Sequence, residues 1–270
     1  MMNSNVMPST NDLAVLVLSC DNYSDLWPIF FKQYKKYWNQ SEFKLYLACN
    51  EKSSNIDGVV DAKSGPDIDW STSLKKSLVK VEENNVLIMI DDAFLKEEVN
   101  HQDFLELYNR FLDSNMDYLR LKNSPLPDIK VDELVGQISP GSLYRTALFP
   151  SVWKKDVLID ILKPGESAWE FELKGSDRSD IYSEFYSVHN DVFKIIHGVI
   201  KGKWHPKALS DLRKLDVEVN QEREVLTFRE VQLLNVGTFR SKILKLFPNS
   251  ARKNIRRFVY SKILNKEWFS

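Results

Sequence analysis

Short runs of aliphatic residues, each closed by polar turn residues, recur along the first 120 positions of the chain. The segments 13–18 (LAVLVL), 43–48 (FKLYLA), 86–90 (VLIMI) and 117–121 (DYLRL) have the composition of buried strands. Between them, apolar residues recur near helical spacing in 24–38, 71–83 and 101–115. Alternation of buried strands and helices predicts an α/β fold with a mostly parallel sheet covered by helices on both faces.

Polar residues at the segment ends and beyond position 122 predict the remaining boundaries. Ser24 or Asp25 is expected to cap the first helix, and Ser71 or Thr72 the second. Prolines and a glycine predict loops over 125–144. A strand or turn is then expected over 144–148, a helix over about 151–162, and a short helix from about 167.

Polar side chains follow three of the predicted strands. In parallel sheets the carboxyl ends of the strands share one edge, where ligands bind, so we expect these side chains to lie together. Adjacent aspartates at a strand end suit Mg²⁺ or Mn²⁺, although a solvated turn or a helix cap accounts for such a pair equally well. The residues are Ser19, Cys20 and Asp21 after the first strand, Cys49, Asn50 and Glu51 after the second, and Asp91 and Asp92 after the third.

Several other classes of protein are disfavoured. The first strand leads into SCDNYSD and not into a glycine-rich phosphate turn, which argues against dinucleotide binding, and a Walker-type loop is absent. The apolar runs are far shorter than the roughly 20 residues of a membrane span, and the start of the chain does not resemble a signal peptide. We therefore expect a cytoplasmic protein with two reduced cysteines.

Four motifs in order resemble GT-A-type glycosyltransferases of bacterial capsule and O-antigen loci, across residues 12 to about 208. They are SCDNYSDLWPIFF, DIDWSTSL, IDDAFL and WKKDVLIDILKPGESAWEFELKGSDRSD. The resemblance implies a Rossmann-type GT-A-like sheet, with a nucleotide-sugar half at 12–122 and an acceptor half at 123–208. It also implies a nucleotide-diphosphate sugar donor, with a UDP-sugar favoured, and an oligosaccharide or lipid-linked glycan acceptor of bacterial surface polysaccharide.

The resemblance assigns roles to the strand-end residues. Asp92 is the expected ligand of Mn²⁺ or Mg²⁺, with Asp91 as a ribose partner or second ligand. Because this chain has adjacent aspartates where the family has a spaced pair, it stays open which one binds the metal and how much metal matters. Trp70 can instead be a core aromatic, and the lysines a solvated helix face. The expected donor contacts are Ser19, Asp21, Tyr23, Asn50, Asp67, Trp70, Lys75 or Lys76, and Asp91.

The second acidic cluster, ESAWEFE, is expected at the acceptor side. Ser167 and Glu170 have the spacing of a capping box, which gives Glu170 a structural role. Glu172 has no such role and is therefore favoured over Glu170 as the general base of an inverting transfer, although a retaining reaction stays open. Arg178 is expected to contact a phosphate, to orient a glutamate or to form an ion pair. His189 and His205 are candidate metal ligands by resemblance.

The end of the chain is strongly basic. Residues 231–266 hold nine Lys and Arg and no acid, so the rest of the chain has 28 basic and 38 acidic residues, a balance of −10. We expect a disordered segment at 1–11 and a basic helical extension at 209–270, of which 239–266 suits an anionic membrane surface or packs on the domain itself. The acidic body argues against nucleic acid. Alternative functions are a metal-dependent hydrolase of phosphate or glycosidic bonds and a non-catalytic nucleotide- or glycan-binding module.

Overall fold

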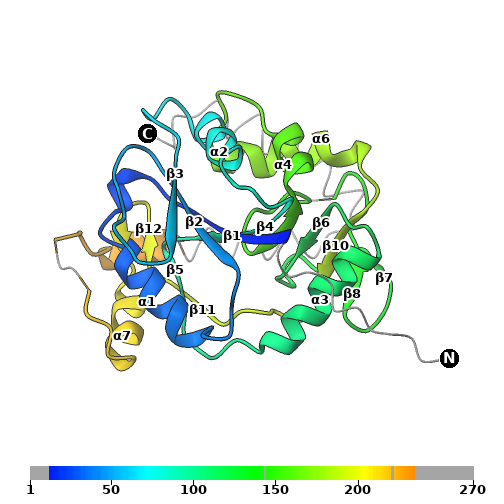
Figure 1. Cartoon of the computed structure of the whole chain (residues 1–270). Coiled ribbons are helices and arrows are strands. Elements are labelled where there is room, and N and C mark those ends of the chain that lie inside the picture. The colour runs from blue at the N-terminus through cyan, green and yellow to red at the C-terminus, as the bar shows by residue number, and fades with distance from the viewer. Residues whose placement is uncertain (1–11, 143, 220–221, 235–270) are drawn as a thin grey trace.

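A central sheet organises the molecule, as the computed structural model shows for residues 12–142, 144–219 and 222–234 (Figure 1). Within these residues, nine strands form one sheet in the order β3-β2-β1-β4-β9-β6-β10-β8-β7. All of them run in one direction except β9 and β8, which are antiparallel to their neighbours. The expected mostly parallel α/β sheet is therefore confirmed. The strands are β1 (Leu13–Leu18), β2 (Lys44–Cys49), β3 (Val59–Lys63), β4 (Asn85–Ile90), β6 (Tyr118–Arg120), β7 (Ile129–Lys130), β8 (Val135–Gln137), β9 (Ser151–Lys154) and β10 (Phe185–Val188).

Helices cover both faces of this sheet, as expected from the alternation of segments. All six residues of β1 are buried, and they alternate between two hydrophobic clusters, with Leu13, Val15 and Val17 in one and Ala14, Leu16 and Leu18 in the other. Each face needs its own cover because successive side chains of a strand point to opposite sides. The first cluster contains α1 (Trp27–Tyr37), α3 (His101–Asp113) and α7 (Pro206–Lys214), and the second contains α2 (Trp70–Leu78) and α4 (Lys155–Ile161) (Figure 1).

Small elements complete the part of the chain after position 90. The strands β5 (Ala93–Leu95) and β11 (Ile195–His197) pair with each other, as do β12 (Val199–Ile200) and β13 (Lys203–Trp204). Trp204 also forms a parallel bridge with Val225, which adds the segment after α7 to this hairpin. The acceptor-side helix begins with α5 (Ala168–Glu170) and continues through a π-helical turn (Phe171–Gly175) into α6 (Ser176–Arg178).

The structure corrects the predicted boundaries at three places. The segment expected to be helical from 151 begins as strand β9 and becomes helix α4 only at Lys155, because a strand with the buried sequence SVW fits between β4 and β6. The cap of α2 is Asp69, whose side chain accepts from Thr72 N–H, and not Ser71 or Thr72. The first helix begins after Leu26 with no side-chain cap.

Two predicted segments lie outside the described residues, namely 1–11 and 235–270. The predicted N-terminal disorder and the predicted membrane-binding helix at 239–266 fall there and stay predictions. Among the helices of the described ranges, none combines the length and apolarity of a membrane span. Both cysteines, Cys20 and Cys49, are thiols.

Candidate active site

Asp91 lies in a polar cluster at the carboxyl ends of β1 and β4, which are neighbours in the sheet. The Ser19 hydroxyl donates to its carboxylate and accepts from the Trp27 indole N–H at 2.6 Å. The side chain is 4% exposed, and this burial raises its pKa well above the usual range of an aspartate. Ser19 and Asp91 are thus brought together as expected, and Asp91 is fixed in one orientation.

Asp92 is the more accessible of the two aspartates. Burial raises its pKa to about 6, while a hydrogen bond from its own backbone N–H and the nearby Arg223 guanidinium act in the opposite direction. Its backbone carbonyl accepts from Gly198 N–H at 2.7 Å, which joins the acidic turn to the β11–β12 segment. Asp92 is therefore the carboxylate of the pair that is placed to meet a ligand.

Arg223 is a residue of this site that the sequence analysis missed. Its guanidinium donates to both carboxylate oxygens of Asp25, at 3.0 and 2.5 Å, and to the carbonyls of Gly202 and Asn22 at 3.0 Å. It also lies over the Tyr23 ring, 4.6 Å from the ring centroid. No motif around Arg223 indicates this contact. The segment that carries Arg223 and Val225 is positioned by tertiary contacts, among them the bridge between Val225 and Trp204. The Arg223 guanidinium is close enough to lower the pKa of Asp91 and Asp92, although Asp25 is its ion-pair partner.

Tyr23 lies in the same cluster. Burial raises the pKa of its hydroxyl, and the charges of Asp92 and Asp91 act in the same direction. Tyr23 is therefore close enough to the aspartate pair to respond to its charge, and its expected role as a donor contact stays a prediction.

Asp21 and Asn50 tie together the loops that follow β1 and β2. The Asp21 carboxylate accepts from the backbone N–H groups of Asn50, Glu51 and Lys52, each at 3.0 Å, and the Asn50 side-chain oxygen accepts from Asp21 N–H at 3.1 Å. The two predicted donor contacts thus meet at the sheet edge. Their hydrogen bonds show that they hold the two loops in register, which is a structural role.

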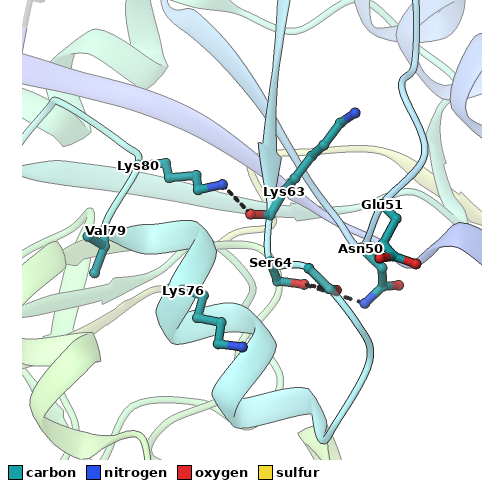
Figure 2. A pocket seen from close by; sticks show the side chains of 8 residues that line it. Asn50, Glu51, Lys63, Ser64, Lys76, Val79 and Lys80 are labelled. Carbon is teal, nitrogen blue, oxygen red and sulfur yellow. Dashed lines mark hydrogen bonds between the residues drawn. The ribbon is translucent and has the colours of Figure 1, made fainter.

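An open pocket of about 620 Å³ lies beside these loops, at the ends of β2 and β3 and against α2 (Figure 2). In Figure 2, Lys80 donates to the backbone carbonyl of Lys63, and Asn50 donates to the Ser64 hydroxyl. Lys76 lines this pocket, whereas Lys75 is an exposed residue of the same helix. The lining residues are Asn50, Glu51, Lys63, Ser64, Gly65, Lys76, Val79 and Lys80.

Asp67 and Trp70 lie in and after the loop that follows β3. Asp67 is exposed and close enough to Cys20 to help raise the pKa of that thiol, after the larger effect of burial, so it lies near the end of β1. The Trp70 ring packs on Phe171, with ring centroids 5.6 Å apart. Trp70 therefore has the core-packing role that was left open, and it joins α2 to the acceptor-side helix.

The two glutamates of the second acidic cluster differ sharply. Glu170 forms the predicted capping box with Ser167 and an ion pair with Lys174 at 2.8 Å, and these contacts lower its pKa to about 2. Glu172 is more buried, which raises its pKa, and its Oε1 accepts from Leu148 N–H at 2.9 Å. A carboxylate with a raised pKa is the better proton acceptor, so the chemistry favours Glu172.

A short chain of contacts joins Glu172 to the aspartate pair. Leu148, whose N–H donates to Glu172, is followed by Phe149. The Phe149 ring packs edge-on against the His197 ring, with ring centroids 6.3 Å apart. His197 pairs with Ala93, the residue after Asp92. Lys122 is close enough to influence the pKa of both Glu172 and His197. These contacts connect the loop that binds Glu172 with the segment that follows Asp92.

The remaining candidates lie in other surroundings. The Arg178 guanidinium forms a two-pronged ion pair with Glu166, at 2.8 and 2.5 Å, and donates to the Ile161 carbonyl, so it is engaged away from both predicted glutamates. His189 follows β10, three positions along the sheet from β4, and its Nε2 lies 3.1 Å from the Asp132 carbonyl. His205 is closer to the acidic turn. Its backbone N–H donates to the carbonyl of Gly198, and the Gly198 N–H donates to the backbone carbonyl of Asp92.

The Arg178–Glu166 pair gives a prediction about stability. Replacing Glu166 with Ala should lower the free energy of unfolding by about 3 kcal/mol, because a largely buried guanidinium would lose its counter-charge. The matched control is Lys44→Ala, which breaks an ion pair between side chains that are 40% and 78% exposed and should change the free energy of unfolding far less, because solvent screens exposed pairs. Urea unfolding of both variants measures the difference, and equal costs would contradict the structural role of the pair.

The residues around Asp92 fit a divalent metal ion that takes only one or two ligands from the protein. Within the described ranges, no group of three or more His, Cys, Asp or Glu side chains is arranged to hold a metal ion. Mg²⁺ commonly uses one or two carboxylates and completes its shell with water and substrate phosphates. Asp92 can supply one such carboxylate, whereas the Asp91 carboxylate is engaged by Ser19. The metal role of Asp92 stays a prediction.

Comparison with known proteins gives weak similarities to solved structures. No protein-family model matches this sequence, and no curated protein sequence matches it significantly. The solved structures include S. aureus TarS 1–349 in complex with UDP-GlcNAc, which is 13% identical with a TM-score of 0.48 over 72% of this chain and 60% of that chain. The bifunctional IspDF from Campylobacter jejuni is 14% identical with a TM-score of 0.40, over 67% of this chain and 50% of that chain. The chain thus spans about 60% of the length of TarS 1–349, and we base the function on its own side chains.

Proposed function

We propose that this protein is a glycosyltransferase that moves a sugar from a nucleotide-diphosphate donor, favoured to be a UDP-sugar, to an oligosaccharide or lipid-linked glycan acceptor of a bacterial surface polysaccharide. One observation carries the proposal. Two half-buried carboxylates with raised pKa values, Asp92 and Glu172, are connected through the contact of Phe149 with His197, beside the carboxyl end of β4 in an α/β sheet. This is the edge where such sheets bind ligands.

The donor side is supported by the polar cluster around Asp92. Asp92 would meet the diphosphate end of a donor, while the neighbouring Asp91 is held by a hydrogen bond from Ser19. A bound Mg²⁺ or Mn²⁺ ion would stabilise the negative charge that develops on the diphosphate leaving group. The ion pair between Arg223 and Asp25 lies near this cluster, and its guanidinium lowers the pKa of Asp91 and Asp92.

The acceptor side is supported by Glu172. In an inverting transfer, the acceptor hydroxyl oxygen forms a bond to the anomeric carbon while the bond from that carbon to the diphosphate oxygen breaks. The electron pair of the broken bond leaves with the diphosphate, and the hydroxyl proton moves to Glu172. Leu148 N–H would hold the carboxylate in place for this step, and the cap and low pKa of Glu170, about 2, favour Glu172 over it as the base.

A thermal-shift panel of UDP, GDP and ADP, each with Mn²⁺ or with EDTA, tests the donor class. At a concentration of about 100 times Kd, a nucleotide should stabilise the native state by about 2.7 kcal/mol, which corresponds to several degrees in Tm. UDP is expected to give the largest shift, and Mn²⁺ to increase it. Stabilisation by none of the three nucleotides would contradict the transferase. Consumption of a UDP-sugar at an equal rate with and without acceptor glycans would favour the hydrolase alternative.

A further inference from the structure

Gly198 lies against two aromatic rings, next to the acidic turn that carries Asp92. A Cβ atom on Gly198 would lie 2.3 Å from Phe94 Cε2 and 2.9 Å from Trp204 Cζ3, whereas non-bonded carbon atoms prefer a separation of about 3.5–4.0 Å. Both rings are at most 1% exposed, and they stack with centroids 6.0 Å apart. Because ring atoms in a packed interior have little room to move, any residue larger than glycine would displace them.

Glycine is required here by the close approach of the two rings and not by the backbone conformation. The φ angle of Gly198 lies outside the left-handed region. Gly58 is the opposite case, because its φ is +74° and a Cβ atom there would meet no atom within 4 Å. The effect of an alanine at position 198 would therefore come from the displacement of Phe94 and Trp204.

The backbone of Gly198 is bonded to the acidic turn and to the start of α7. Its N–H donates to the Asp92 carbonyl at 2.7 Å, and its carbonyl accepts from His205 N–H at 2.8 Å. His205 is the N-cap of α7. The preceding residue, His197, pairs with Ala93, so the short ladder of β5 and β11 leads directly into the bond with Asp92. The backbone position of Asp92 is thus coupled to that of Gly198.

Trp204 connects the same packing to the loop after β1. Its backbone N–H donates to the Glu224 carbonyl at 2.8 Å. Arg223 directly precedes Glu224, and its guanidinium forms the ion pair with Asp25 and lies over the Tyr23 ring. A displacement of Trp204 would therefore move the segment that holds the loop after β1.

We propose that Gly198 is a positioning residue of the donor site, and that its contact with Phe94 and Trp204 sets the place of Asp92 relative to the loop after β1. Asp92 follows β4, which is the neighbour of β1 in the sheet, so a donor at this edge would meet both segments. A displacement of about 1 Å in such a site can slow a reaction about 100-fold. This inference rests on the proposed function and adds to it a residue that acts through packing.

Hydrogen exchange followed by mass spectrometry tests the positioning without a ligand. In Gly198→Ala, the amides of 93–95 and 223–226 should exchange about tenfold faster, because local opening of their hydrogen bonds becomes easier. Strand β1 should keep its protection, which separates a local displacement from a general loss of stability. The control is Gly58→Ala, which adds the same methyl group in open space and should leave 93–95 and 223–226 unchanged.

The affinity for UDP in the presence of Mn²⁺ tests the consequence for the donor site. Gly198→Ala should weaken UDP binding about 10- to 100-fold, the range expected when a partner behind a metal ligand is lost. Adding Phe94→Leu to Gly198→Ala removes the ring atom that the new methyl group would meet, so this double variant should bind UDP more tightly than Gly198→Ala alone. Gly58→Ala should bind UDP like the native protein, and isothermal titration calorimetry measures each Kd.

The outcomes separate this positioning role from the proposed function. Faster exchange of 93–95 and 223–226 in Gly198→Ala, in a protein that no nucleotide stabilises, would support the positioning and contradict the transferase. Equal UDP affinity of Gly198→Ala and the native protein would overturn the role of Gly198 in the donor site alone, and unchanged exchange would also overturn it. A double variant that binds UDP no more tightly than Gly198→Ala would contradict the contact with Phe94 as the cause.

Trp204→Leu keeps the test decisive if Gly198→Ala does not fold. This variant loosens the same contact without adding atoms next to Gly198. Weaker UDP binding and faster exchange of 93–95 and 223–226 would support the positioning role, whereas native values of both would overturn it. Circular dichroism of each variant confirms that the fold is kept.

Discussion

Replacing Glu172 with Gln should slow sugar transfer by about 10²–10⁴-fold, because general-base catalysis contributes about that factor and an amide cannot take the proton. Gln keeps the oxygen that accepts from Leu148 N–H, so the fold and donor binding should be unchanged. Transfer of a radiolabelled sugar from a UDP-sugar to a glycan acceptor measures the rate, and nucleotide thermal shifts measure donor binding.

The matched control for this prediction is Glu170→Gln, two positions earlier on the same helix. Glu170 is the N3 residue of the capping box whose N-cap is Ser167, and Gln is also accepted at N3, so this variant should keep most of its stability and activity. Equal loss of activity in the two variants would contradict the assignment of the base. Burial raises the pKa of Glu172, so the native rate should fall as the pH drops through a value above the usual 4.3 or so of a glutamate. Glu172→Gln should lack this acidic limb.

Replacing Asp92 with Asn should stabilise the protein without ligands and abolish the effect of Mn²⁺ on nucleotide binding. The pKa of Asp92 is raised to about 6 in the folded protein, against about 3.9 when unfolded. The native state therefore binds the proton more tightly, and stability is lost as the pH rises from about 4 to 6. At pH 7.5 both states are ionised, so removing the charge should raise the free energy of unfolding by about 2 kcal/mol.

Urea unfolding in EDTA at pH 7.5 and at about pH 4 measures this effect. The gain should fall to about 0.5 kcal/mol at the lower pH, where the carboxyl is protonated in the folded state and about half protonated in the unfolded state. The control is Asp57→Asn, an exposed aspartate, which should change stability by less than about 0.5 kcal/mol at either pH. A destabilised Asp92→Asn variant, or one whose nucleotide binding still responds to Mn²⁺, would contradict a role of Asp92 in ligand or metal binding.

The sequence predicted the parts of the molecule whose residues interact locally. Strands β1 and β4 and helix α3 have strong apolar periodicity, and the capping box of Ser167 and Glu170 needs only four consecutive residues. Strand β3 was missed because it lies at the sheet edge with mostly exposed or half-buried residues, so it lacks a buried pattern.

The candidate site was predictable only where its residues follow strands. The meeting of Ser19 with Asp91 and of Asp21 with Asn50 follows from the common edge of parallel strands. Arg223 and the pairing of Arg178 with Glu166 depend on tertiary contacts between segments with no readable motif. The close contact of Gly198 with Phe94 and Trp204 likewise depends on tertiary packing that no local pattern indicates.

The ion pair between Arg223 and Asp25 has a consequence for how the protein is made. The partners are 198 positions apart, so the loop after β1 leaves the ribosome long before the guanidinium that completes its surroundings. At about 5–20 residues per second, this interval is roughly 10–40 s. For about the last two thirds of it the nascent chain carries the aspartate pair of the proposed donor site without the ion pair between Arg223 and Asp25, so the surroundings of the site are complete only after Arg223 has been added.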